Sequence, residues 1–187
     1  MTRVSGQRRS GFSIVELLVV VAIIGMVAGV SSVSWRSILP RTALNGDVRT
    51  LGARIQSTRS DSISRNQTFE LVYDLDNDLY WIRPPYDDEG NLLTERMQED
   101  TERIQQFLTQ LSDGVTFAEL VLDGERHTEG LWQVTFDALG SSSDHYVVLY
   151  HEAYDRYHTV EVLALTGLIR FHDGIFEREE PNDSDFN

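Results

Sequence analysis

The chain has 187 residues, with 30 acidic and 16 basic side chains and a formal net charge of −14 at pH 7. Every basic residue is Arg, and the sequence contains neither Lys nor Cys. This composition excludes lysine Schiff bases, disulfides, thiolate catalysis and Cys-ligated metal centres. The negative charge argues against nucleic acid as a partner, because an acidic protein repels the phosphate backbone.

The charge is unevenly distributed along the chain. Residues 1–11 form a basic leader with three Arg and no acid, and the 22 residues Phe12–Val33 that follow are almost entirely apolar. As a helix, such a segment is about 33 Å long, close to the roughly 30 Å of a bilayer core. Basic residues on its short amino-terminal side predict a single membrane span with the carboxyl-terminal body on the far side.

Two simpler interpretations of this segment fit less well. A secretory signal peptide has an apolar stretch of about 7 to 15 residues and a small-residue cleavage site, and the candidate sites Ala28–Val30 and Ser31–Val33 are imperfect. A plain membrane anchor does not explain Glu16, because a carboxylate inside a membrane span is costly and indicates a functional role.

The ten residues Gly11–Val20, GFSIVELLVV, resemble the cleavage and methylation motif of type IV pilins and type II secretion pseudopilins. The resemblance implies that a dedicated membrane aspartyl peptidase, the prepilin peptidase, cleaves between Gly11 and Phe12. It also implies that Phe12 becomes the N-methylated first residue of the mature chain. Glu16 then lies at the fifth position, where the family has its glutamate.

Cleavage would give Phe12 a cationic amine in a membrane environment. The Glu16 carboxylate of a neighbouring subunit could pair with that amine, so that two costly buried charges offset each other and fix the axial register of the helices. A pair within one chain is the alternative, because Glu16 lies one helical turn beyond Phe12.

Residues 40–67 continue the helix in amphipathic form. Leu44, Val48, Leu51, Ile55, Thr58 and Ser62 are spaced by three or four residues and share one helical face. We therefore expect residues 12–39 and 40–67 to be the membrane, or filament-core, half and the amphipathic half of one long helix.

Residues 68–176 are predicted to form an antiparallel β-sheet domain, followed by an acidic tail at 177–187. The predicted strands are Phe69–Tyr73, Leu79–Ile82, Val115–Leu122, Trp132–Asp137, Tyr146–Glu152 and Thr159–Leu165. A short amphipathic helix is predicted at Glu99–Ser112, and a final hairpin at Leu168–Phe176 with its turn at His172–Gly174. The fold class is α+β and pilin-like, with the long helix packed on the sheet.

The body carries a second resemblance, in Val134–Ser143, Thr159–Val162 and Leu165–Arg170. These segments are similar to the carboxyl-terminal region of the H-type minor pseudopilin of type II secretion, whose domain a minor pilin of the type IV system shares. The sequence departs from the family pattern at Ala138-Leu139 and at Leu168.

The sequence contains only incomplete motifs for catalysis or metal binding. Asp74–Asp78 begins like a calcium loop but lacks the Gly and Glu that an EF-hand requires, which leaves a solvated turn or a looser calcium site. His151-Glu152 lacks the second His of a zinc protease motif. Ser143, Asp144 and His145 are adjacent in sequence, whereas a catalytic triad converges in space. We expect no catalytic residue, no metal and no cofactor.

The sequence thus predicts a structural, non-enzymatic minor pseudopilin of the bacterial inner membrane, with its carboxyl-terminal domain in the periplasm. Its expected partners are other pilin or pseudopilin subunits, the prepilin peptidase and inner-membrane lipid. The alternatives are a minor type IV pilin for pilus assembly or DNA uptake, which would need a basic stripe, and a membrane-tethered enzyme.

Overall fold

A computed structural model of the protein describes residues 13–94, 103–164 and 166–177, with only the helical backbone described for residues 28–42. The predicted leader, Gly11, Phe12 and all but the first residue of the predicted tail lie outside these residues. The chain divides into two compact units, with the boundary between Leu39 and Pro40. Helix α1, Ile14–Arg65, contributes its first part to one unit and its second part to the other.

Within the described residues, no helical stretch is both long and apolar enough to qualify as a membrane span. The predicted span, Phe12–Val33, includes Phe12 and the side chains of residues 28–33, which lie outside the description.

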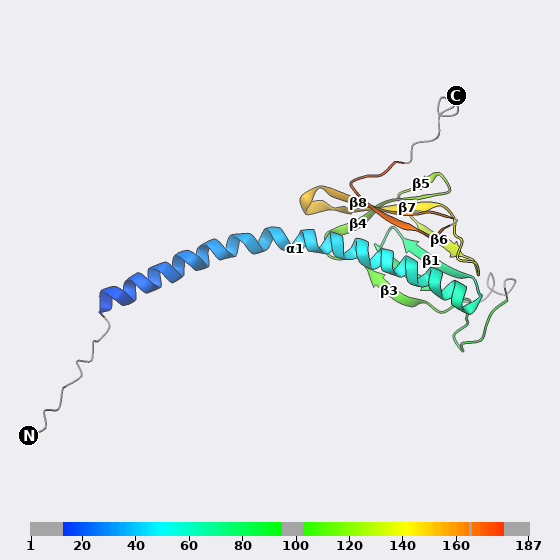
Figure 1. The fold of residues 1–187 in the computed structure, drawn as a ribbon, viewed down its shortest axis with the longest axis horizontal. Helices are drawn as coiled ribbons and strands as arrows, with labels where there is room; N and C mark the ends of the chain where they lie inside the picture. The colour runs from blue at the N-terminus through cyan, green and yellow to red at the C-terminus, as the bar shows by residue number, and fades with distance from the viewer. Residues whose placement is uncertain (1–12, 95–102, 165, 178–187) are drawn as a thin grey trace, which may run out of the picture. The chain divides into compact units, whose positions relative to one another are not determined.

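The second unit contains two antiparallel sheets, where the sequence analysis expected a single sheet (Figure 1). The four-stranded sheet has the order β3-β2-β1-β6 and the five-stranded sheet the order β5-β4-β7-β8-β9. The strands are β1 Phe69–Asp74, β2 Leu79–Arg83, β3 Gln106–Gln110, β4 Val115–Leu122, β5 Glu125–His127, β6 Leu131–Phe136, β7 His145–His151, β8 Arg156–Val162 and β9 Ile169–Asp173. A 3-10 turn, η1 Glu152–Tyr154, joins β7 to β8.

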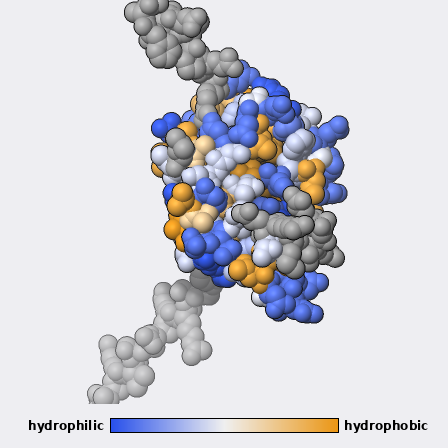
Figure 2. Space-filling model, turned by 90° about the vertical axis from the view of Figure 1, so that its right-hand side faces the viewer, coloured by the Kyte–Doolittle hydropathy of each residue, from blue (hydrophilic) through white to orange (hydrophobic). Residues whose placement is uncertain are grey.

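Both sheets and the second part of α1 share one hydrophobic core. The predicted helical stripe is confirmed, since its six members are all buried: Leu44, Val48, Leu51, Ile55, Thr58 and Ser62. Facing them are the inward side chains of both sheets, among them Phe69, Leu71, Tyr73, Phe117, Val134, Phe136, Leu149 and Val160. The helix therefore binds the two sheets into one body. Figure 2 shows one face of the molecule as mostly hydrophilic, with apolar side chains in small separate patches.

The predicted helix at Glu99–Ser112 is wrong for its described part. Residues Gln106–Gln110 form β3, which pairs with the edge of β2. The pairing shifts register between Tyr80 and Ile82, and Phe107 has a positive φ of 57°. This bulge interrupts the alternation of the strand, so its apolar residues fall at a spacing that imitates a helix.

The predicted final hairpin is also wrong. His172 and Asp173 belong to β9, which pairs along β8, and the chain then turns at Gly174. The Gly174 N–H donates to the Tyr157 carbonyl at 2.9 Å, and the Phe176 N–H donates to the Thr159 hydroxyl oxygen at 3.1 Å. Because β8 pairs with this segment, His172 and Asp173 form the end of β9 and not the turn that was expected there.

The Asp-rich turn between β1 and β2 is confirmed as a hairpin turn, and its carboxylates bond to backbone amides. The Asp74 carboxylate accepts the N–H groups of Asp76 and Asn77 at 3.2 and 3.1 Å. Asp78 accepts the N–H of Phe117 in the other sheet at 2.8 Å. Burial raises the pKa of Asp78 above its ordinary value, while the bond from Phe117 opposes that rise. The acids of this turn thus act in folding, and one of them joins the two sheets.

Candidate functional site

The described part of the first unit begins with a capped helix start. The Ser13 hydroxyl oxygen accepts the N–H of Val15 at 3.3 Å, and the Ser13 carbonyl accepts the N–H groups of Glu16 and Leu17 at 3.0 and 3.2 Å. Ser13 is therefore the N-cap, and Glu16 is the third residue of the helix. An acid in the first turn is stabilised by the positive end of the helix dipole.

The side chain of Glu16 is exposed, and within the described residues it has neither an ion pair nor a hydrogen bond. Its proposed partner, the amine of Phe12, lies outside the description. The spacing Ser13-x-x-Glu16 also suits a capping box, in which a Glu or Gln reaches back to the N-cap amide. Glu16 thus has two candidate roles: capping its own helix, or pairing with the amine of a neighbouring subunit. Replacing it with an uncharged Gln distinguishes them, because Gln can cap the helix but cannot form the ion pair.

The helix from Ile14 to Val27 exposes apolar side chains on all sides. Ile14 is 81% exposed, Met26 is 79% exposed and even Val20 is 45% exposed. A helix that is apolar all round is stable only when lipid or protein covers it. This segment therefore requires an apolar environment, and Glu16 is its single charged side chain.

The motif residues in the body meet the helix at Arg59. The Arg59 Nε–H donates to the carbonyl of Gly140 at 2.9 Å. Both Gly140 and Gly167 have positive φ, 79° and 59°, and a Cβ at Gly167 would lie 2.1 Å from the Arg59 Nε. The two turns of the body that resemble the H-type pseudopilin therefore need glycine, both for their backbone conformation and to make room for the Arg59 side chain.

Asp47, Arg54 and Arg59 lie outside the apolar stripe of the helix, and no role was expected for them. In the structure Asp47 accepts the backbone N–H and the hydroxyl of Ser112 at 2.9 and 3.0 Å. The Arg54 guanidinium lies 4.3 Å from the centre of the Phe107 ring. The partners of Asp47 and Arg59 are 65 and 81 positions away in sequence, so no local pattern could have revealed them.

The rejected catalytic motifs form no catalytic arrangement in the described structure. His145 is buried with Nδ1 3.0 Å from the Ser143 carbonyl, while the Asp144 carboxylate accepts the N–H of Ala164 at 3.3 Å. His151 ends strand β7, so the sequence around it is not the helix that a zinc protease motif requires. The described residues contain no group of three or more His, Asp or Glu positioned to hold a metal ion.

Comparison with known proteins finds both a sequence family and solved structures that match this chain. The family described as the prokaryotic N-terminal methylation motif matches residues 6–32, which include Gly11, Phe12 and Glu16. A crystal structure of the minor pseudopilin EpsH from the type II secretion system of Vibrio cholerae matches with a TM-score of 0.53 and 14% identity, over 75% of this chain and 99% of that one. This chain carries a prepilin methylation motif on a minor pseudopilin fold.

A second structure of EpsH from the same system matches with a TM-score of 0.49 and 13% identity, over 70% of this chain and 97% of that one. No curated protein matches the sequence. The pseudopilin fold accounts for the α+β architecture with its amino-terminal helix. The matched motif coincides with the exposed apolar start of that helix.

Proposed function

We propose that this chain is a structural minor pseudopilin of a type II secretion system, which assembles into or initiates a pilus-like filament that drives protein export. One observation carries the proposal: the exposed apolar helix Ile14–Val27 has a single carboxylate, Glu16, and lies inside a prepilin methylation motif. The pseudopilin fold of the body supports it. In this role the protein is not an enzyme.

The proposal assigns a part to each segment of the chain. Residues 1–11 are the leader removed by the prepilin peptidase, and residues 12–39 lie in the inner membrane before assembly and in the filament core afterwards. Residues 40–67 attach this helix to the globular domain 68–176, which occupies the periplasm, and 177–187 form an acidic tail. Other pilin or pseudopilin subunits and inner-membrane lipid are the partners of the helix.

The assembly requires a contact that sets register. Head-to-tail stacking of identical or related subunits generates a helical filament. Moving the apolar helix from lipid into a protein core gains little hydrophobic energy, because lipid tails are as apolar as the side chains. A charge pair between the amine of Phe12 and the Glu16 carboxylate of a neighbouring subunit would supply the specificity that apolar contacts lack.

The test replaces Glu16 with Gln and, separately, with Ala. A Gln retains the capping-box interaction but not the charge. If Glu16 forms an intersubunit ion pair, we expect both variants to insert into the membrane and both to fail to enter filaments. The measurement is the amount of the chain that co-purifies with sheared filaments, relative to the amount in the membrane. We expect a reduction of about tenfold or more, since losing one partner of a buried charge pair costs about 3–5 kcal/mol.

Glu125→Gln, an exposed acid on the edge strand β5, is the matched control and should assemble like the wild type. Normal assembly of Glu16→Gln beside a defective Glu16→Ala would assign Glu16 to helix capping instead. Normal assembly of both variants would show that Glu16 does not set the register between subunits.

A further inference from the structure

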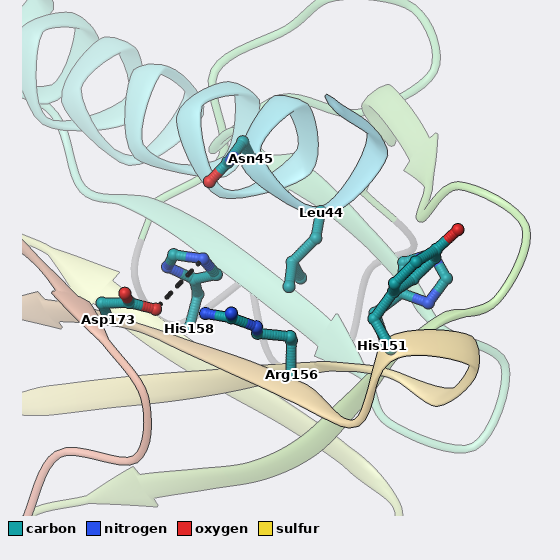
Figure 3. Close-up of a pocket in the computed structure, with 7 residues that line it drawn as sticks. Leu44, Asn45, His151, Arg156, His158 and Asp173 are labelled. Atoms are coloured by element: carbon teal, nitrogen blue, oxygen red, sulfur yellow. Dashed lines mark ion pairs between the residues drawn. The ribbon is translucent and has the colours of Figure 1, made fainter. Parts of the chain in front are cut away.

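A pocket of about 270 Å³ opens in the body between helix α1 and the ends of strands β7, β8 and β9 (Figure 3). Leu44 and Asn45 of the helix face it from one side, and charged or titratable side chains of the five-stranded sheet face it from the other. The pocket lies wholly within the second unit and away from the methylation motif. It is therefore separate from the site that the proposed function uses.

The central charge of the pocket is Arg156. Figure 3 shows its side chain extending between His158 and His151, beneath the helix. The Arg156 residue is exposed, and within the described part of the chain its side chain has neither an ion pair nor a hydrogen bond. Other arginines of this acidic protein do have acidic partners: Arg83 and Arg103 pair with Glu70, and Arg126 pairs with Glu119 and Glu177. A guanidinium without a partner in a pocket is available to an anion.

Two histidines extend the polar lining on either side of Arg156. His158 Nε2 lies 3.6 Å from the Asp173 carboxylate, and both side chains line the pocket. His151 is only 4% exposed, and its Nδ1 is buried without a hydrogen-bond partner among the described residues. A buried polar atom left unsatisfied costs about 1–3 kcal/mol.

The lining selects among anions. The planar fork of an arginine matches a carboxylate with two parallel hydrogen bonds. Asp173 places a negative charge on the same wall and disfavours a multiply charged anion such as phosphate. Leu44, which is 3% exposed, provides an apolar surface beside the polar groups. We propose that this pocket binds a carboxylate carried on a short apolar stem, with Arg156 as its main anchor.

The experiment titrates the full chain in detergent micelles and follows the histidine ring resonances by NMR. The probes are propionate and a Gly-Gly-Leu peptide with a free carboxyl terminus, compared with the same peptide amidated and with inorganic phosphate. The two carboxylate probes distinguish a free small acid from the end of a polypeptide. Binding of either, with loss on amidation of the peptide, supports a carboxylate site.

Arg156→Gln should weaken binding of the carboxylate probe at least tenfold, and Arg156→Lys should weaken it less, because Lys retains the charge without the fork. Arg170→Gln is the matched control, an exposed arginine on the neighbouring strand β9 that does not line the pocket. It should leave the affinity within twofold of the wild type. Thermal unfolding of each variant verifies that the body is folded.

Three results would overturn the proposal: no binding of any carboxylate, tighter binding of phosphate than of carboxylate, or equal weakening by Arg156→Gln and Arg170→Gln. None of them bears on filament assembly, which depends on Glu16, so the pocket and the proposed function succeed or fail separately.

Discussion

His145 is a titratable side chain enclosed in the body of the protein. It is 3% exposed, its Nδ1 lies 3.0 Å from the Ser143 carbonyl, and its ring meets that of Tyr73 edge-on. Burial lowers the pKa of His145 from 6.5 to about 4, against the opposing effect of the hydrogen bond that its ring donates to the Ser143 carbonyl. The ring is therefore neutral in the folded protein throughout the range in which a solvated histidine becomes protonated.

This depressed pKa predicts a loss of stability in mild acid. Above pH 6.5 the ring is neutral in both states, whereas between pH 6.5 and 4 the unfolded chain binds a proton that the folded chain does not. The free energy of unfolding should fall by about 1.4 kcal/mol per pH unit in this window. Urea unfolding at pH 7 and 4.5 should therefore show a decrease about 2.5 kcal/mol larger for the wild type than for His145→Gln.

His127→Gln, at a half-exposed histidine of strand β5, is the control and should retain the wild-type pH dependence. An equal decrease for the wild type and His145→Gln would show that His145 is protonated without unfolding.

At the scale of single residues, the sequence predicted which kind of element a residue occupies but not which distant residue it contacts. Asp78 was expected in a turn between two strands, and it is there. Its bond to the N–H of Phe117, 39 positions away, depends on how the two sheets approach each other. The lack of an ion pair at Arg156 among the described residues is likewise a property of the fold, because it depends on where strand β9 places Asp173, whose carboxylate lies beside His158 instead.

At the scale of elements, local periodicity predicted the helix well and the strands unevenly. The stripe from Leu44 to Ser62 is a repeat of three and four residues, and burial follows it throughout. Strand β4 was predicted at its observed bounds. Strand β3 was missed because its bulge at Phe107 breaks the alternation, and β5 was missed because three residues carry too little pattern.

The contact between helix α1 and the turn at Gly167 allows a quantitative prediction. Gly167→Ala combines a positive φ with a Cβ that would overlap the Arg59 side chain, whereas Gly174→Ala has a positive φ of 97° and nothing within 4 Å of the Cβ. The conformational cost, about 1–2 kcal/mol at Gly167, is at least as large at Gly174, whose φ lies further from the left-handed region that L residues adopt. A larger loss for Gly167→Ala in chemical denaturation, expected at about 1–3 kcal/mol, therefore comes from overpacking against Arg59.

Arg59→Ala should remove this difference between the two glycine variants, because it removes the group that is overlapped. Equal losses for Gly167→Ala and Gly174→Ala in the presence of Arg59 would show that the turn moves aside at no cost.

At the scale of the whole molecule, the amino-terminal motif and the fold class were more predictable than the pairing of the strands. The methylation motif is a contiguous sequence signal, and the pilin-like α+β class follows from one long helix and several strands. The division of the strands into two sheets was not predictable, because it depends on which strand pairs with which. Strand β6 pairs with β1, some sixty positions earlier, while β4 pairs with β7.

The proposed processing also concerns the whole chain. In cells that contain the prepilin peptidase, intact-mass analysis of the membrane-extracted protein should show loss of residues 1–11 and the addition of one methyl group. Gly11→Leu should block cleavage, because the resemblance places Gly11 immediately before the cut, and Gly6→Leu in the same leader should not. Full-length protein in such cells, or cleavage at another site, would contradict the proposal.

The link from Arg59 to the carbonyl of Gly140, with Gly167 closed over the same side chain, has a mechanical consequence. Tension applied along the second part of α1 would reach both turns directly through one guanidinium. The load would then be shared between the loop that joins β6 of one sheet to β7 of the other and the loop that joins β8 to β9. The force would therefore not act on a single outermost strand, β6 or β9, alone.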